Sequence, residues 1–173
     1  MQISLSDWRE VDGQEQTVTE SELWDSVTFQ GQTIGFKGPV QLSFHLTSSG
    51  SSLLVRGEIA AEMELTCSRC TAPFVQPVRY KVSEIIPLNP GDDPDGYWTS
   101  LFLDQETDEL DLSEFSLMVL LENFPLQPLC RRDCRGLCTV CGQDLNQGDC
   151  DCATDQIDPR WAKLGQLLEK GKK

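Results

Sequence analysis

Eight cysteines in closely spaced groups constrain the fold of this chain more than any other feature of its sequence. Cys67 and Cys70 form one pair in mid-chain, and six more follow within residues 130–152. Two residues between cysteines let both thiolates reach one tetrahedral ion about 2.3 Å away without straining the backbone. The chain starts with no basic region followed by an apolar stretch, so we expect a reducing cytoplasmic location. Clustered thiols in such a compartment bind metal more often than they form disulfides.

The last four cysteines form the clearest predicted metal site. They are Cys138, Cys141, Cys150 and Cys152. Gly142 follows the second of them, and a glycine there can take a positive φ that turns backbone N–H groups towards the sulfurs. The surrounding residues are mostly charged, and such a segment cannot bury cysteines as small core residues.

The other four cysteines suggest a second site that ties the end of a strand to the chain after a helix. They are Cys67, Cys70, Cys130 and Cys134. No glycine follows Cys70, so the pattern predicts a weaker metal-binding turn there. Two alternatives stay open, free thiols and a different grouping of the ligands. The main alternative quartet is Cys130, Cys134, Cys138 and Cys141.

Four thiolates without histidine favour structural zinc, so we expect one or two zinc ions. An iron–sulfur cluster also uses four cysteines and is the alternative cofactor.

The hydrophobic pattern predicts an α+β fold built on an antiparallel sheet. Apolar and polar residues alternate over residues 40–46, 53–65 and 74–86, the period of half-buried strands. Short turns join these segments, which predicts an antiparallel meander. Residues 87–96 have the composition of a loop, and a short strand is expected over residues 97–103.

Two helices are predicted after the meander. Asp111 and Glu114 have the spacing of a capping box, and the helix they open ends before Pro125. Asp158 and Pro159 predict the start of a C-terminal helix. The expected organisation is a β-rich core over residues 1–128 that ends in a helix, a zinc-binding segment over 129–153 and a helix over 154–173.

Charge narrows the class of partner. The chain has 28 acidic and 14 basic residues, a formal net charge of −14. A protein that binds nucleic acid directly normally carries a basic face, so this balance favours a basic partner. We expect a dense acidic stretch to contact it. That stretch comprises Asp104, Glu106, Asp108, Glu109, Asp111 and Glu114.

Signals of catalysis are absent from the sequence, and we expect a non-catalytic protein. There is no phosphate-binding loop and no nucleophile elbow. A redox role for Cys67 and Cys70 is the alternative, but such a pair normally opens a helix, and this pair follows a strand. No apolar run approaches the roughly 18 residues of a membrane helix, so no membrane contact is expected.

Several motifs together resemble a known family. Cys67-x-x-Cys70 precedes Pro73-Phe74, the run from Pro125 to Cys130 leads into the tail, and Cys138-Thr139-Val140-Cys141-Gly142 follows. Over roughly residues 40–165 this resembles the YceD family, also called the large ribosomal RNA subunit accumulation protein family.

The resemblance implies a factor for 23S ribosomal RNA accumulation and large-subunit biogenesis. A basic ribosomal protein or a pre-large-subunit particle is then the expected partner. Direct RNA binding stays open as an alternative, through Arg131, Arg132, Arg135 and the basic residues of 163–173.

Overall fold

The structure is a computed structural model that describes residues 1–93, 95–98, 102–104 and 108–152. Its elements, in chain order, are β1 (Gln2–Ser4), α1 (Ser6–Arg9), β2 (Glu15–Glu22), β3 (Val27–Phe29), β4 (Gln32–Phe36), β5 (Val40–Ser49), β6 (Ser52–Thr66), β7 (Pro73–Pro87), the 3-10 turn η1 (Pro90–Asp92), β8 (Leu103–Asp104), β9 (Glu109–Asp111) and α3 (Leu112–Glu122). The predicted α+β class agrees with these antiparallel strands and the two described helices.

The main sheet is antiparallel and has β6 at its centre. Its order is β2-β5-β6-β4-β3, and β7 pairs with the other edge of β6. Strands β5, β6 and β7 follow one another in the chain and pair as neighbours, which confirms the predicted meander. β7 is an edge strand, a place where Pro73, Pro77 and Pro87 cost no central ladder hydrogen bond. A smaller sheet has the order β1-β9-β8.

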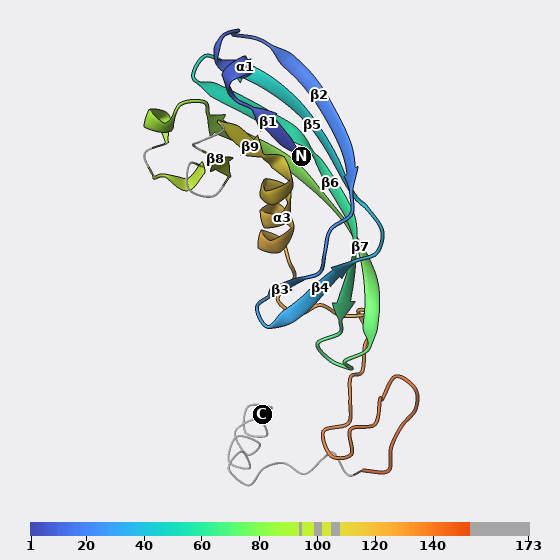
Figure 1. Ribbon diagram of the computed structural model, residues 1–173. Coiled ribbons are helices and arrows are strands. Elements are labelled where there is room, and N and C mark those ends of the chain that lie inside the picture. Colours follow the sequence, from blue (N-terminus) through green and yellow to red (C-terminus); the bar gives the residue numbers. More distant parts are fainter. Residues whose placement is uncertain (94, 99–101, 105–107, 153–173) are drawn as a thin grey trace, which may run out of the picture.

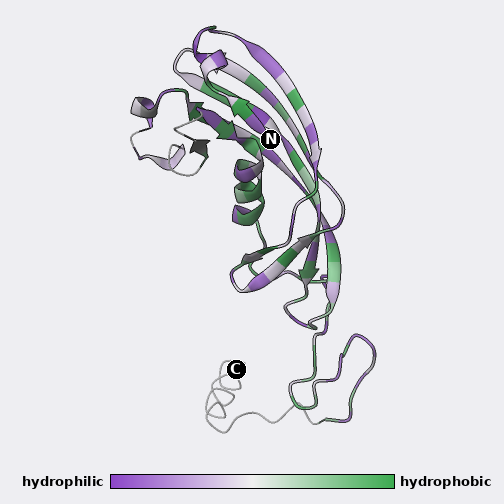
Figure 2. Cartoon of the chain, viewed as in Figure 1, coloured by the Kyte–Doolittle hydropathy of each residue, from purple (hydrophilic) through white to green (hydrophobic). Residues whose placement is uncertain are grey.

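The main sheet is strongly curved, and its concave side holds the core (Figure 1). α3 and the smaller sheet lie against that side (Figure 1). Alternate residues of β5 and β6 point into the core, among them Phe44, Leu46 and Val55, which are fully buried. Figure 2 shows the same alternation as hydrophobic and hydrophilic bands along these strands. Each such side chain contributes about 1.5–3 kcal/mol when fully buried.

α3 begins where the sequence predicts. The Asp111 carboxylate accepts hydrogen bonds from the backbone N–H groups of Ser113 and Glu114, at 2.9 and 3.1 Å. This confirms the predicted N-cap, an interaction that typically contributes about 1 kcal/mol. The helix ends at Glu122, before Pro125.

The predicted strand over residues 97–103 is wrong in its first part. The backbone N–H of Phe102 donates to the carbonyl of Trp98 at 3.0 Å, the i to i−4 contact of a helical turn. The rings of Trp98 and Phe102 both pack on Phe115 of α3, so aromatic contacts override the local pattern. Of the described residues 97, 98, 102 and 103, only Leu103 belongs to a strand, β8. The predicted helix from Asp158 lies outside the described residues.

None of the helices described in the structure is long and apolar enough to cross a membrane.

The expected acidic stretch is partly occupied by contacts within the chain. Asp108 forms a two-point ion pair with Arg9, in which Arg9 Nη2 lies 2.7 Å from Asp108 Oδ1. Asp111 caps α3. Glu106 lies outside the described residues. The stretch therefore does not present all its carboxylates to a partner.

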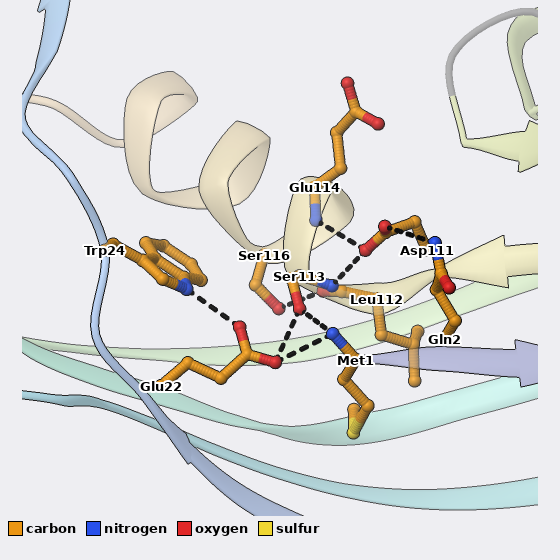
Figure 3. Close-up of polar contacts among 9 residues, drawn as sticks. All are labelled: Met1, Gln2, Glu22, Trp24, Asp111, Leu112, Ser113, Glu114 and Ser116. Carbon is orange, nitrogen blue, oxygen red and sulfur yellow. Dashed lines mark hydrogen bonds and ion pairs between the residues drawn. The ribbon is translucent and has the colours of Figure 1, made fainter.

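A half-buried ion network joins β2 to the start of α3 (Figure 3). The amino group of Met1 lies 2.7 Å from Glu22 Oε1, and the Ser113 hydroxyl donates to the same oxygen. The Trp24 indole donates to Glu22 Oε2 at 2.8 Å. Burial of Glu22 opposes its ionisation, but these donors outweigh it and lower its pKa to about 2.

We expect Glu22→Gln to destabilise the fold at neutral pH and to have a smaller effect in acid. The pKa of Glu22 in the folded state lies below its ordinary value of 4.5, so the carboxylate stabilises the fold above pH 4.5. That contribution disappears as the pH falls from 4.5 towards 2. We expect a difference from wild type of about 2 kcal/mol in the free energy of unfolding at pH 7. Urea titrations at pH 7 and pH 3 measure it. Glu20→Gln, an exposed change on the same strand, is the control, and an equal effect of both variants would contradict the assignment.

Candidate metal centre

The first cysteine tetrad joins the sheet to the chain after α3. Cys67 directly follows β6, Cys70 lies in the turn before β7, and Cys130 and Cys134 follow α3. All four sulfurs lie within 4.8 Å of one another. The Sγ atoms of Cys67 and Cys134 are 3.8 Å apart, and those of Cys70 and Cys130 are 3.7 Å apart.

These sulfur separations fit a tetrahedral metal site. Four sulfurs that each lie about 2.3 Å from a central ion are about 3.8 Å from one another. A disulfide would bring two sulfurs to about 2.05 Å, and all eight cysteines are free thiols. The first tetrad thus has the size of a four-thiolate cage.

The second tetrad is formed within one short segment. It contains Cys138, Cys141, Cys150 and Cys152, whose sulfurs also lie within 4.8 Å of one another. Cys138 is buried and Cys141 is exposed. The structure therefore groups the eight cysteines as the sequence favoured, and the alternative quartet that mixes the two sets does not form.

The two Cys-x-x-Cys turns have the same backbone geometry. In each, the backbone N–H two residues after the first cysteine points at its sulfur, at 3.5 Å for Cys67 and 3.4 Å for Cys138. In each, the residue after the second cysteine has a positive φ, 57° at Thr71 and 75° at Gly142. Its N–H donates to the carbonyl of the first cysteine, at 3.0 and 2.9 Å.

The turn after Cys70 thus adopts the same geometry without a glycine, and its predicted weaker metal binding stays a prediction. Thr71 adopts the left-handed conformation in place of glycine, which costs roughly 1–2 kcal/mol for such a residue. The strands β6 and β7 on either side hold this turn in shape, since they pair along their whole length.

The thiols of each tetrad differ in acidity. Burial raises the pKa of Cys67, but three backbone N–H groups outweigh it and lower the pKa to about 6. Backbone N–H groups also lower the pKa of Cys138 to about 6. Burial and the neighbouring thiols raise the pKa of Cys130 to about 12, and the Cys141 side chain with burial does the same for Cys152. Four thiolates in so small a space repel one another, so full deprotonation of a tetrad calls for a cation within it.

Asn146 connects the two tetrads. Its side-chain amide donates to Cys134 Sγ at 3.5 Å, so a residue from the loop of the second tetrad contacts a sulfur of the first. Its Oδ1 accepts from the backbone N–H of Arg135 and from Arg131 Nη2, both at 2.8 Å. The backbone N–H of Leu145 donates to the carbonyl of Gly136 at 2.9 Å and reinforces the contact.

Arg69, which lies between Cys67 and Cys70, also contacts the chain around Cys134. Its Nη1 donates to the carbonyl of Cys134 at 2.8 Å. Gly136 lies against it with φ of 75°, and a Cβ there would come 3.1 Å from the Arg69 carbonyl oxygen. Sequence reasoning missed Arg69, Thr71 and Asn146 as site residues. No spacing pattern marks Arg69 and Asn146, whose partners are distant in the chain, and the motif favours glycine where Thr71 stands.

We expect Asn146→Ala to loosen the second tetrad from the first. The variant leaves the backbone N–H of Arg135 without its acceptor, and a hydrogen bond of about 1–1.5 kcal/mol corresponds to roughly tenfold. Amide hydrogen exchange of Arg135, followed by NMR, should accelerate by about that factor. Gln147→Ala is the control, because the Gln147 side chain donates to the Asp144 carboxylate and to no other group among the described residues. Equal exchange rates in the two variants would show that Asn146 does not hold the segment.

A family of known proteins matches the part of the chain that contains both tetrads. The model of the family described as large ribosomal RNA subunit accumulation protein YceD matches residues 55–168, more than half of the chain. The chain belongs to the YceD family. The match includes all eight cysteines of the two tetrads. The match starts inside β6, so the strands before β6 lie outside the residues that the family model matches.

Relatives of this YceD-family chain occur in mycobacteria and in plants. An uncharacterized protein of Mycobacterium tuberculosis is 32% identical over 130 residues, which cover 75% of this chain and 62% of the relative. The large ribosomal RNA subunit accumulation protein YCED homolog 1, chloroplastic, of Arabidopsis thaliana is 23% identical over 158 residues, covering 76% of this chain and 49% of that protein. The chain thus spans about three-fifths of its mycobacterial relative. No solved structure matches it.

Proposed function

We propose that this YceD-family chain is a non-catalytic factor that supports 23S ribosomal RNA accumulation and large-subunit biogenesis, with structural zinc in both tetrads. The family description and the name of the Arabidopsis relative support the ribosomal role. The observation that carries the metal assignment is the presence of two complete sets of four cysteine sulfurs in compact groups.

Zinc suits these tetrads better than iron–sulfur clusters. The sulfur separations of 3.7 and 3.8 Å in the first tetrad match a single tetrahedral ion. Four protein thiolates fill the coordination sphere of such an ion, which is typical of a structural rather than a catalytic zinc site. A cluster would need several iron and sulfide atoms between the same ligands.

Elemental analysis of protein purified without chelator tests the metal. We expect two zinc ions per chain and no iron. A brown protein with iron and visible absorption would overturn the zinc assignment.

A non-catalytic role agrees with the placement of the thiols. The Cys67 sulfur lies 3.8 Å from that of Cys134, and the Cys70 sulfur lies 3.7 Å from that of Cys130. This arrangement suits metal binding better than disulfide exchange. Cys67 and Cys70 also lie in a hairpin turn between β6 and β7, away from any described helix N-terminus that would activate a thiol.

A basic ribosomal protein or pre-large-subunit particle is the partner that the charge favours. The net charge of −14 opposes binding to RNA phosphates. Two of the three arginines considered for RNA binding at residues 131–135 are also engaged within the chain, Arg131 with Asn146 and Arg135 with Asp149. A basic ribosomal protein before assembly exposes segments meant for RNA, and an acidic surface can bind them.

A deletion strain and a tagged chain test the ribosomal role. We expect 23S ribosomal RNA and large subunits to fall in the deletion strain and to recover with the wild-type gene. The tagged chain should recover a basic large-subunit protein at low salt and lose it as salt rises. Unchanged 23S levels in the deletion strain would overturn the ribosomal proposal.

A further inference from the structure

A groove with apolar walls lies between the β2–β3 connection, β4 and the first turns of α3. Its volume is about 410 Å³. Trp24 and Phe36 form one wall, with ring centroids 5.4 Å apart and planes at 85°. Leu117 of α3 forms part of the opposite wall, and Leu23 lies at the edge with 83% of its surface exposed. Leu23 thus extends the apolar wall of the groove to its exposed edge.

The aromatic wall is held in place before any ligand arrives. The Trp24 indole is fixed by its hydrogen bond to Glu22, and the Ser113 hydroxyl holds the other Glu22 oxygen at 2.7 Å (Figure 3). The ring therefore loses little conformational freedom when a partner binds, which favours affinity.

The rim of the groove is acidic. Asp25 and Glu114 line it, and no basic residue does. Both side chains are exposed, and within the described part of the chain neither forms an ion pair. The Glu114 carboxylate points away from the network around Glu22 (Figure 3). Two free carboxylates beside an aromatic wall suit a side chain with an aliphatic stem and a positive end.

We propose that this groove binds an arginine or lysine side chain, flanked by an apolar residue, from a basic segment of a protein partner. The aliphatic stem packs on Trp24 and Phe36, where a cation near the ring face gains further attraction. The charged end meets Asp25 and Glu114, and the flanking apolar residue covers Leu23. The identity of the partner as a basic protein rests on the proposed function, whereas the groove and its chemistry do not.

A pair of synthetic peptides tests the chemistry of the groove. One is a capped hexapeptide of alternating arginine and leucine, and the other has citrulline, a neutral shape-match, in place of arginine. We expect the arginine peptide to shift the Trp24 indole N–H in NMR spectra of the full chain. The citrulline peptide should bind at least tenfold more weakly. Equal affinity for both peptides, or no shift at Trp24, would overturn the proposal.

Matched variants separate the groove from the overall charge. Asp25→Asn with Glu114→Gln should weaken binding of the arginine peptide at least fivefold. Asp7→Asn with Glu10→Gln removes the same charge from exposed positions at α1 and should change it less than twofold. Equal losses in the two double variants would show that only net charge attracts the peptide.

The apolar edge is tested by a second matched pair. Leu23→Ser should weaken the peptide at least threefold, whereas Leu126→Ser, at a leucine that is 79% exposed elsewhere, should have no effect. If Leu23→Ser instead abolishes self-association of the chain and leaves peptide binding unchanged, the groove binds a second copy and the proposal fails.

Complementation distinguishes this inference from the proposed function. If deletion of the gene leaves 23S levels normal, the ribosomal proposal fails while the peptide result still decides the groove. If deletion lowers 23S levels, the two double variants are compared for their ability to restore them. Equal recovery with the groove variant (Asp25→Asn, Glu114→Gln) and the control variant (Asp7→Asn, Glu10→Gln) would show that the ribosomal partner does not bind in the groove.

Discussion

Replacing Cys141 with serine should disorder the second tetrad and its loop while the curved sheet stays folded. Apparent binding energies at structural zinc sites are about 10–16 kcal/mol, comparable to the roughly 5–15 kcal/mol that stabilise a whole domain. The segment over residues 138–152 buries little apolar surface, since Cys138 is its one buried residue among those described. Its hydrogen bonds to Arg131 and Arg135 are exposed to solvent and contribute little. The sheet has its own apolar core, and none of the four cysteines of the second tetrad belongs to that core.

NMR spectra of the backbone and metal analysis together check this result. We expect the resonances of residues 138–152 to collapse to random-coil positions, those of β5, β6 and β7 to stay unchanged, and the zinc content to fall from two ions to one. Val140→Ser, an exposed change in the same turn, is the control. Unchanged resonances of the tail in the Cys141→Ser variant would show that the segment folds without the metal.

Replacing Gly57 with alanine should cost about 3 kcal/mol or more in the free energy of unfolding, above the usual range for overpacking. Gly57 lies opposite Phe44 in the β5–β6 pair. An added Cβ would come 2.1 Å from the Ser43 carbonyl oxygen and 2.6 Å from the Phe44 ring. Phe44 is fully buried, and the Ser43 oxygen belongs to the backbone of a paired strand, so neither atom can move aside cheaply.

Urea unfolding of the two glycine variants measures this cost. Gly91→Ala is the control, because nothing lies within 4 Å of a Cβ at that position. A loss for Gly57→Ala within about 0.5 kcal/mol of the control would show that β5 and β6 separate easily at this point.

The two predictions concern parts of the chain that are stabilised differently. Gly57 lies in an apolar core that forms by burial, whereas Cys141 lies in a polar loop that we propose is held by a bound ion. We therefore expect loss of the ion from the second tetrad alone to act on the tail and to leave the midpoint of sheet unfolding nearly unchanged. The first tetrad links the two parts, because two of its ligands flank the β6–β7 turn and two follow α3.

Local patterns were sufficient to predict the meander, the start of α3 and the second tetrad. Alternation over residues 40–86 predicts β5, β6 and β7 because side-chain direction in a strand repeats every two residues. Asp111 predicts the helix start because a cap bonds to residues two and three positions ahead. The second tetrad was predictable because all its ligands lie within residues 138–152, where spacing alone limits the geometry.

Tertiary structure decided whatever depends on residues far apart in the chain. The first tetrad forms because the fold brings Cys67 to Cys134 and Cys70 to Cys130, pairs separated by 67 and 60 residues. The left-handed Thr71 follows from the pairing of β6 and β7 around it, against the residue's own preference. The groove also joins distant segments, residues 23–36 and the start of α3. Spacing rules describe short stretches of backbone, and these contacts depend instead on how the whole sheet curves around its core.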